Sequence, residues 1–154
     1  MALGTRLKGT SRSQAGSGQG PRKARATTRA KPLILCVDDE QDALTILRLF
    51  LSAHGFAITV ASSATEALRL VADRHPDLII TDYAMPDMNG LDLCRALRGS
   101  GETHDIPIIL HSGVDLREDH ADLFDHFLLK PAELELLARE IRSLLPAAHA
   151  QKSA

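Results

Sequence analysis

Four short apolar segments, each followed by a polar side chain, constrain the fold of this chain more than any other feature. The polar residues at their ends are Asp38 and Asp39, Asp82, Ser112 and Lys130. A strand buried in a parallel sheet reads as a nearly continuous apolar run, and its last side chain reaches the rim of the sheet. In open α/β sheets, ligands bind at this edge. Three carboxylates, one hydroxyl and one ammonium there can hold a divalent cation and accept a phosphoryl group.

Amphipathic segments alternate with these apolar runs. Within residues 41–54, Leu44, Leu47 and Leu51 lie on one helical face, as expected for a helix that packs on a core. The other predicted helices cover about residues 63–75, 91–97 and 132–145, with a short one within 116–124, and a further strand is predicted at 57–61. Five strand–helix units predict an α/β fold with a parallel sheet covered on both faces.

The charge of the chain divides sharply near residue 31. Residues 1–31 contain eight Lys or Arg and no acid, whereas residues 32–154 contain ten bases and twenty acids, which gives a net charge of −10. Sequence-independent DNA binding needs clustered Lys and Arg, so the acidic part is a poor candidate for it. Residues 1–30 are expected to be a disordered basic tail and residues 147–154 a short disordered tail. One folded domain, 31–146, remains.

Several roles stay open for the basic segment. It has the composition of a flexible tail, but a transit peptide, a weak tether to nucleic acid or a membrane surface, and a start codon assigned too early are alternatives. The two cysteines form no disulfide framework and are expected to be small buried residues, as in a reducing compartment. No apolar run approaches the length of a membrane span. We therefore expect a cytoplasmic protein without a membrane span.

The polar residues at the strand ends and their neighbours resemble the receiver domain of two-component response regulators. The residues that carry the resemblance are Asp38-Asp39-Glu40, Asp82 with Met85-Pro86 and Asn89-Gly90, Ser112-Gly113, and Lys130-Pro131. They follow the family's order over about residues 32–146. The resemblance implies a flavodoxin-like (βα)5 three-layer sandwich with strand order 2-1-3-4-5. In that order the first and third strands are neighbours, so Asp38 and Asp39 lie beside Asp82.

The resemblance also implies a role for each residue of the site. Mg2+ would be bound directly by Asp39 and Asp82, mainly through water by Asp38, and by the backbone carbonyl of Ala84. Asp82 would be the modified residue, accepting a phosphoryl group from a histidine of a histidine kinase or histidine phosphotransfer protein. Lys130 and Ser112 would neutralise charge on that group. A plainer interpretation is that Asp38 or Asp39 caps the first helix, that Lys130 is a surface lysine and that Ser112 is a turn residue.

A switch is implied as well. In the family, the hydroxyl residue moves toward the modified aspartate, and an aromatic residue three positions before the lysine rotates into the vacated space. Here these are Ser112 and Phe127, although Phe127 also reads as an ordinary core residue. The family's Lys-Pro peptide bond is typically cis, so Pro131 is expected to fix the direction of Lys130.

The chain departs from the family pattern in two places. Ser112 and Lys130 are 18 positions apart, about four fewer than usual, which is about one turn of the fourth helix. Because this helix belongs to the dimerisation face of many relatives, we expect a monomer or weak dimer. Ala84 and Val114 replace polar residues that in many relatives guide the hydrolytic water, which predicts slow loss of the phosphoryl group. The histidines, including His111, show no metal-ligand spacing and are expected to be exposed or hydrogen-bonded.

Three function classes are compatible with the residues. The first is a single-domain phospho-acceptor switch without a DNA-binding or enzymatic output domain, which acts on an unknown target protein in a phosphorelay. The second is a pseudo-receiver that binds a partner without phosphorylation. The third is an aspartyl-nucleophile hydrolase, which needs an acid two positions after the nucleophile. That position is Ala84, so the sequence argues against a dedicated enzyme.

Overall fold

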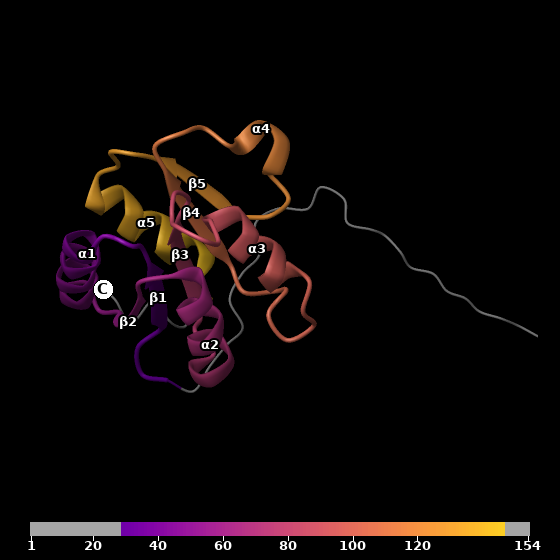
Figure 1. Cartoon of the computed structure of the whole chain (residues 1–154). Helices are drawn as coiled ribbons and strands as arrows, with labels where there is room; N and C mark the ends of the chain where they lie inside the picture. Colours follow the sequence, from indigo (N-terminus) through magenta and orange to yellow (C-terminus); the bar gives the residue numbers. More distant parts are fainter. Residues whose placement is uncertain (1–28, 147–154) are drawn as a thin grey trace, which may run out of the picture.

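Five parallel strands form a single sheet in the order β2-β1-β3-β4-β5 (Figure 1). The strands are β1 (Leu33–Val37), β2 (Ala57–Ala61), β3 (Leu78–Asp82), β4 (Ile108–Ser112) and β5 (His126–Leu129). They belong to a computed structural model in which residues 29–146 are described. This strand order and the alternation with helices confirm the predicted flavodoxin-like (βα)5 fold. The two predicted tails, apart from residues 29 and 30, lie outside the described residues.

Helices cover both faces of the sheet and complete three layers (Figure 1). They are α1 (Gln41–Ala53), α2 (Ala64–Arg74), α3 (Gly90–Arg98), α4 (Arg117–His120) and α5 (Leu134–Leu144). Apolar residues of α1 and α5 pack against one face, and those of α2 and α3 against the other. No helix among residues 29–146 is both long enough and apolar enough to cross a membrane.

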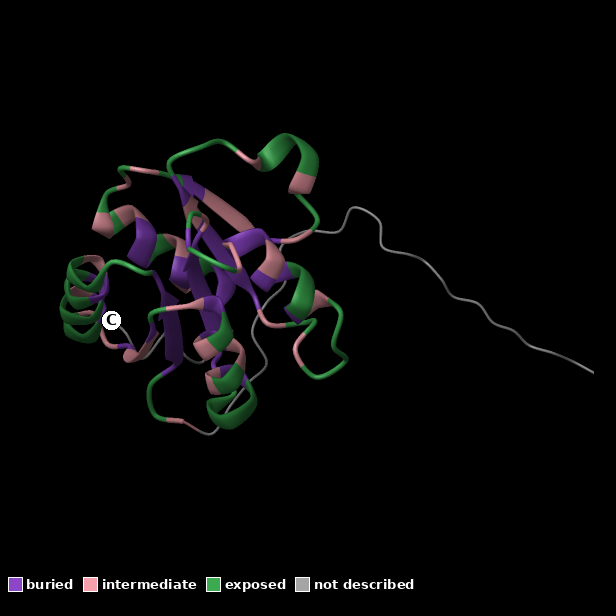
Figure 2. Ribbon diagram, in the orientation of Figure 1, coloured by how far each residue is buried: buried purple, intermediate pink, exposed green. Residues whose placement is uncertain are grey.

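The middle strands explain why the carboxyl edge carries the polar residues. Every residue of β1 and β3 is buried, and Figure 2 shows these strands at the centre of the molecule. Successive side chains of a strand point to opposite faces. Ile80 packs on the α1–α5 side, so Asp82, two positions later, follows it on that side. Leu110 packs on the α2–α3 side, and Ser112 follows it there.

The connection from β4 to β5 is short, as the spacing predicted. Its helix α4 has four residues and none of them is buried. The segment is held at its carboxyl end by Asp125, which accepts a hydrogen bond from the Ile108 amide and pairs with Arg98 at 2.9 Å. Arg98 also donates to the carbonyls of His104 and Ile106. A buried ion pair thus fixes a connection that has little apolar surface of its own.

The two cysteines are free and buried, as expected of small apolar residues. Burial raises the pKa of both thiols to about 12, with smaller contributions from nearby charges. A thiolate is the reactive form of cysteine, so neither side chain is poised for redox or nucleophilic chemistry.

Candidate functional site

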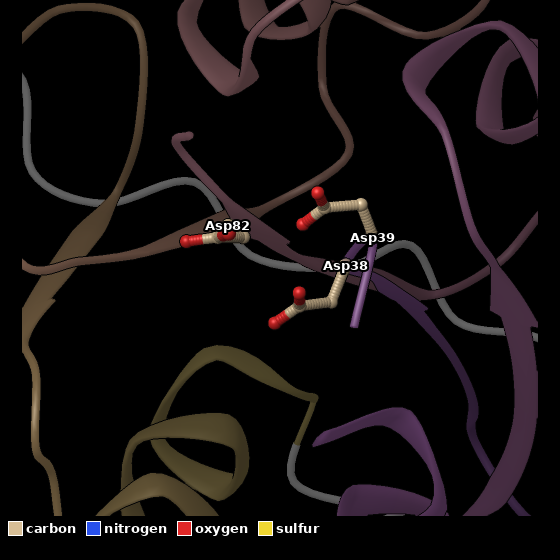
Figure 3. A group of neighbouring side chains, drawn as sticks. All are labelled: Asp38, Asp39 and Asp82. Atoms are coloured by element: carbon tan, nitrogen blue, oxygen red, sulfur yellow. The ribbon is translucent and has the colours of Figure 1, made fainter. Parts of the chain in front are cut away.

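Three carboxylates converge at the carboxyl edge of the sheet. Asp38 and Asp39 follow β1, Asp82 ends β3, and β1 pairs directly with β3. Each offers one oxygen, and these three oxygens all lie within 4.8 Å of one another (Figure 3). Asp38 and Asp82 are buried, whereas Asp39 is exposed. The switch point of the strand order therefore places one solvent-facing and two shielded carboxylates together, as the sequence predicted.

Lys130 joins these acids from the end of β5. Its Nζ atom lies 3.0 Å from Oδ1 of Asp82 and 3.7 Å from Oδ2 of Asp38. Burial alone would lower the pKa of Lys130, but the hydrogen bond and charge of Asp82, with the charge of Asp38, raise it above its ordinary value. The side chain is therefore an ammonium at neutral pH. The peptide bond between Lys130 and Pro131 is cis.

The charge balance of the site is nevertheless negative. The pKa of Asp38 is raised by burial and by the charges of Asp82 and Asp39, although the Glu40 amide and Lys130 act in the opposite direction. The Glu40 amide donates to Asp38 at 2.9 Å, immediately before α1. This donor belongs to the N-cap residue itself, and α1 has no side-chain cap hydrogen bond, so the plainer interpretation that Asp38 caps the helix is wrong, and the side chain belongs to the cluster. One ammonium does not neutralise three carboxylates, so a cation at this position would stabilise them.

Ser112 makes its side-chain hydrogen bonds within its own loop. Its hydroxyl donates to the Val114 carbonyl at 2.8 Å and accepts from the Val114 amide at 3.0 Å. The Ser112 carbonyl accepts a hydrogen bond from the Lys130 amide at 2.7 Å, which ties the ends of β4 and β5 together. The backbone of Ser112 is thus part of the edge that carries the site, whereas its hydroxyl is engaged in its own loop.

Phe127 lies on the α2–α3 side of β5 and is only partly buried. Its ring centroid is 5.8 Å from that of Phe124. The guanidinium carbon of Arg117 lies over the Phe127 ring, 5.4 Å from the ring centroid. Phe127 is therefore neither a fully enclosed core residue nor a free surface residue.

The loop between β3 and α3 carries Ala84, whose side chain is exposed. The loop is held by Gly90, whose amide donates to the Tyr83 carbonyl at 2.9 Å. A Cβ atom at Gly90 would lie 2.2 Å from the Asp82 carbonyl oxygen. The start of α3 therefore packs directly against the backbone of Asp82, and only glycine permits this approach.

Sequence reasoning missed the surroundings of His111. This residue pairs in register with Asp82, and its Nε2 atom is buried without a hydrogen-bond partner within residues 29–146. Burial and then the charge of Lys130 lower the pKa of His111, so the imidazole is neutral at pH 7. The expectation that the histidines are exposed or hydrogen-bonded is therefore wrong here. Its position, one residue before Ser112 in a strand with period-2 alternation, was the available signal.

The sequence model of the response regulator receiver domain family matches residues 34–142. The chain belongs to this family. Response regulator MprA of Mycobacterium leprae is 40% identical to this receiver over 116 residues, which are 73% of this chain and 50% of that protein. The receiver thus spans about half the length of the curated relatives it matches.

Solved receivers share the fold. The receiver domain of a signal transduction histidine kinase from Syntrophus aciditrophicus is 32% identical, with a TM-score of 0.68 over 73% of this chain and 89% of that one. The chemotaxis response regulator CheY4 of Vibrio cholerae, at 24% identity, supports the fold alone, with a TM-score of 0.70 over 75% and 100% of the two chains. The family is a signalling module of two-component systems rather than a dedicated enzyme.

Proposed function

We propose that this receiver accepts a phosphoryl group on Asp82 from a phosphohistidine of a histidine kinase or histidine phosphotransfer protein. An Asp82 oxygen forms the new P–O bond while the P–N bond breaks, and the electron pair of that bond returns to the imidazole of the donor. The observation that carries the proposal is the 3.0 Å contact between Lys130 Nζ and Asp82 Oδ1 inside the carboxylate cluster. A nucleophilic carboxylate and a cation for the phosphoryl oxygens are thereby adjacent.

The donor set fits Mg2+, which prefers carboxylate oxygens and keeps several waters. We assign Asp39 and Asp82 as direct ligands, Asp38 as a ligand mainly through water, and the Ala84 carbonyl as a backbone ligand. A bound Mg2+ supplies positive charge for the phosphoryl oxygens. The exposure of Asp39 and the mutual closeness of the three carboxylates support this assignment.

The remaining residues of the site have complementary tasks. Phosphoryl transfer depends mostly on positioning and on charge stabilisation at the phosphoryl oxygens. Lys130, already an ammonium beside Asp82, provides one fixed positive charge. The Ser112 hydroxyl provides a hydrogen-bond donor once it leaves the Val114 carbonyl, and Phe127 then turns toward the space beside it. This pair of movements changes the surface offered to a target protein.

Mass spectrometry tests the proposal. The intact protein is incubated with acetyl phosphate and Mg2+, and we expect the gain of one phosphate. Asp82→Asn should abolish the gain. The matched variant Asp87→Asn changes an exposed acid of the same loop and should keep it. If the wild-type protein is saturated with Mg2+ and still gains no phosphate, the result would instead favour the pseudo-receiver, a binding module without phosphorylation.

A further inference from the structure

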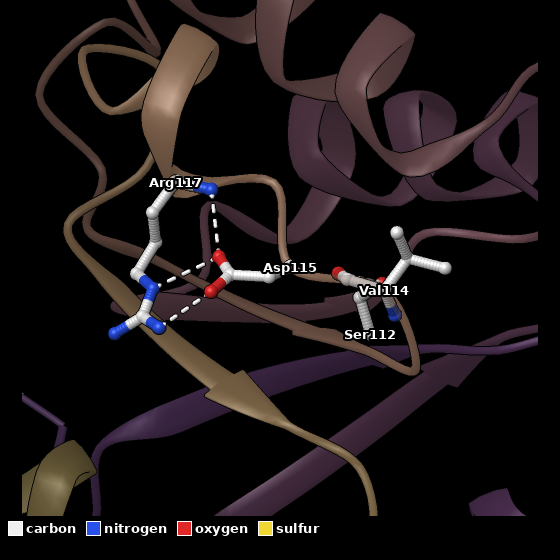
Figure 4. A network of polar contacts seen from close by, with 4 residues as sticks. All are labelled: Ser112, Val114, Asp115 and Arg117. Atoms are coloured by element: carbon white, nitrogen blue, oxygen red, sulfur yellow. Dashed lines mark hydrogen bonds and ion pairs between the residues drawn. The ribbon is translucent and has the colours of Figure 1, made fainter.

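Arg117 is held in one orientation by its neighbour Asp115. The Arg117 backbone amide and Nε atom donate to Asp115 Oδ1 at 3.0 and 2.9 Å, and Nη2 donates to Oδ2 at 2.6 Å (Figure 4). These hydrogen bonds lower the pKa of the Asp115 carboxyl to about 2 and raise that of Arg117, so both groups are charged at neutral pH. The guanidinium fixed in this way is the one that lies over Phe127, 5.4 Å from its ring centroid.

The same loop holds Ser112. Val114 makes both hydrogen bonds to the Ser112 hydroxyl and is followed directly by Asp115. A continuous set of contacts therefore runs from Ser112 through Val114, Asp115 and Arg117 to Phe127. Ser112 and Phe127, the two residues that move in the proposed function, are the first and last members of this set of contacts. No residue of α4 is buried, and within the 113–117 loop the apolar packing against the core comes from Leu116, which is only partly buried.

We propose that Arg117 is a positioning residue that holds the Phe127 ring in the orientation of this structure and thereby stabilises the unphosphorylated state. The inference rests on the proposed function, because it assigns Arg117 a part in the Ser112–Phe127 switch. The contact with Arg117 is made in this orientation of the ring, and rotation of the ring would break it. When Ser112 turns toward the phosphoryl group, the bonds to Val114 break, the 113–117 loop is released, and Arg117 leaves the ring. Phosphorylation thus acts on Phe127 partly by removing this contact.

The direction of the effect follows from population shift. A contact present in one state only biases the equilibrium by its own strength, and an exposed cation–π contact corresponds to about a two- to fivefold change in an equilibrium constant. Arg117→Ala should therefore increase the apparent affinity for a phosphoryl analogue about two- to fivefold. The loss of a positive charge would by itself weaken the binding of an anion, so simple electrostatics predicts the opposite sign.

The experiment uses beryllofluoride with Mg2+ as the phosphoryl analogue, titrated into the full chain and followed by NMR. Phe127 is observed separately by 19F NMR after incorporation of 4-fluorophenylalanine, with Phe127→Leu to assign the resonance. Arg117→Lys keeps the charge but lacks the planar fork that Asp115 holds, and should lie between wild type and Arg117→Ala. Arg69→Ala removes an arginine from another exposed ion pair, with Glu66, and should match wild type.

We expect Arg117→Ala to lower the titration midpoint and to move the Phe127 resonance of the free protein part of the way toward its position in the beryllofluoride complex. Equal midpoints and equal resonances in wild type and Arg117→Ala would overturn the role of Arg117 while leaving the proposed function intact. If wild type binds no beryllofluoride, the proposed function fails and the switch role of Arg117 fails with it. A higher midpoint in Arg117→Ala would show that only charge matters at this position.

Discussion

The Nζ atom of Lys130 lies 3.0 Å from Oδ1 of Asp82, and β4 separates the two strands whose ends carry these residues. The contact therefore spans the carboxyl edge of the sheet rather than a single turn. The position of the Lys130 backbone is fixed by the hydrogen bond from its amide to the Ser112 carbonyl. This bond therefore determines the point from which the Lys130 side chain reaches Asp82. The positive charge over Asp82 is thus a product of the strand order.

Replacing Lys130 by Gln should slow phosphorylation of Asp82 by acetyl phosphate about 100-fold. The reason is that a fixed donor aimed at oxygens where charge develops contributes roughly that factor. Initial rates measured by intact mass at saturating Mg2+ would check this. Lys31→Gln, an exposed lysine at the opposite end of β1, is the control and should leave the rate unchanged. A Lys130→Gln rate within twofold of wild type would remove Lys130 from the mechanism.

Asp38→Asn should stabilise the protein in chelator at pH 7 by about 1 kcal/mol, or about 4 °C in Tm. The folded pKa of Asp38 is raised above 3.8, mainly by burial. The folded protein then binds this proton more tightly than the unfolded one, so the free energy of unfolding falls as the pH rises from 3.8 through the folded pKa. The destabilisation caused by the Asp38 carboxylate is fully present at pH values above the folded pKa and absent below pH 3.8.

Thermal melts from pH 3 to 8 in EDTA would test whether Asp38→Asn raises the Tm as predicted. The advantage of Asp38→Asn should vanish below about pH 3.8, where the carboxyl is protonated in both states. In Mg2+ the order should reverse, because the wild-type cluster binds the cation better and binding stabilises the folded state. Asp73→Asn, an exposed acid of α2, should show neither effect. A Tm gain that persists unchanged at pH 3 would point to a cause other than charge.

Gly90→Ala should destabilise the protein by about 2 to 3 kcal/mol and displace Asp82. An added Cβ atom would lie 2.2 Å from the Asp82 carbonyl oxygen and 3.0 Å from two further backbone atoms, so the backbone must shift. Urea unfolding gives the stability, and the rate of phosphorylation reports the displacement. At Gly101 a Cβ atom would meet nothing within 4 Å, so Gly101→Ala should be neutral. Equal urea midpoints for Gly90→Ala and Gly101→Ala would contradict the steric argument.

The parts of the site that follow from strand order could be predicted from the sequence. Asp38, Asp39, Asp82 and Lys130 end or directly follow parallel strands, and a parallel sheet brings such ends to one edge. The orientation of the Ser112 hydroxyl could not be predicted, because it is set by two hydrogen bonds to the backbone of Val114 in its own loop. The contact of Arg117 with Phe127 was equally invisible, since it depends on the side-chain geometry set by Asp115 in a shortened segment without a repeating pattern.

Asp125→Ala should destabilise the protein by about 3 to 5 kcal/mol, the range for a buried ion pair that loses one partner. The side chain of Asp125 is 1% exposed and that of Arg98 is 10% exposed. The substitution also removes the acceptor of the Ile108 amide at the start of β4. Asp105→Ala removes an exposed acid that pairs with His104 and should cost little. Chemical denaturation of both variants measures the free energies of unfolding. Similar losses in the two variants would show that the buried pair of Asp125 and Arg98 does not stabilise this connection.

The phosphoryl group on Asp82 should be lost slowly, and Ala84→Asn should accelerate its loss about tenfold. Ala84 and Val114 have exposed, apolar side chains, so neither can orient an attacking water, whereas an amide side chain at position 84 can donate and accept hydrogen bonds. Because Ala84 is exposed, the substitution leaves the core unchanged. The decay is followed by intact mass after removal of acetyl phosphate, with Asp87→Asn as the control in the same loop. A wild-type half-life of seconds, or an Ala84→Asn decay no faster than wild type, would show that water is positioned by other groups.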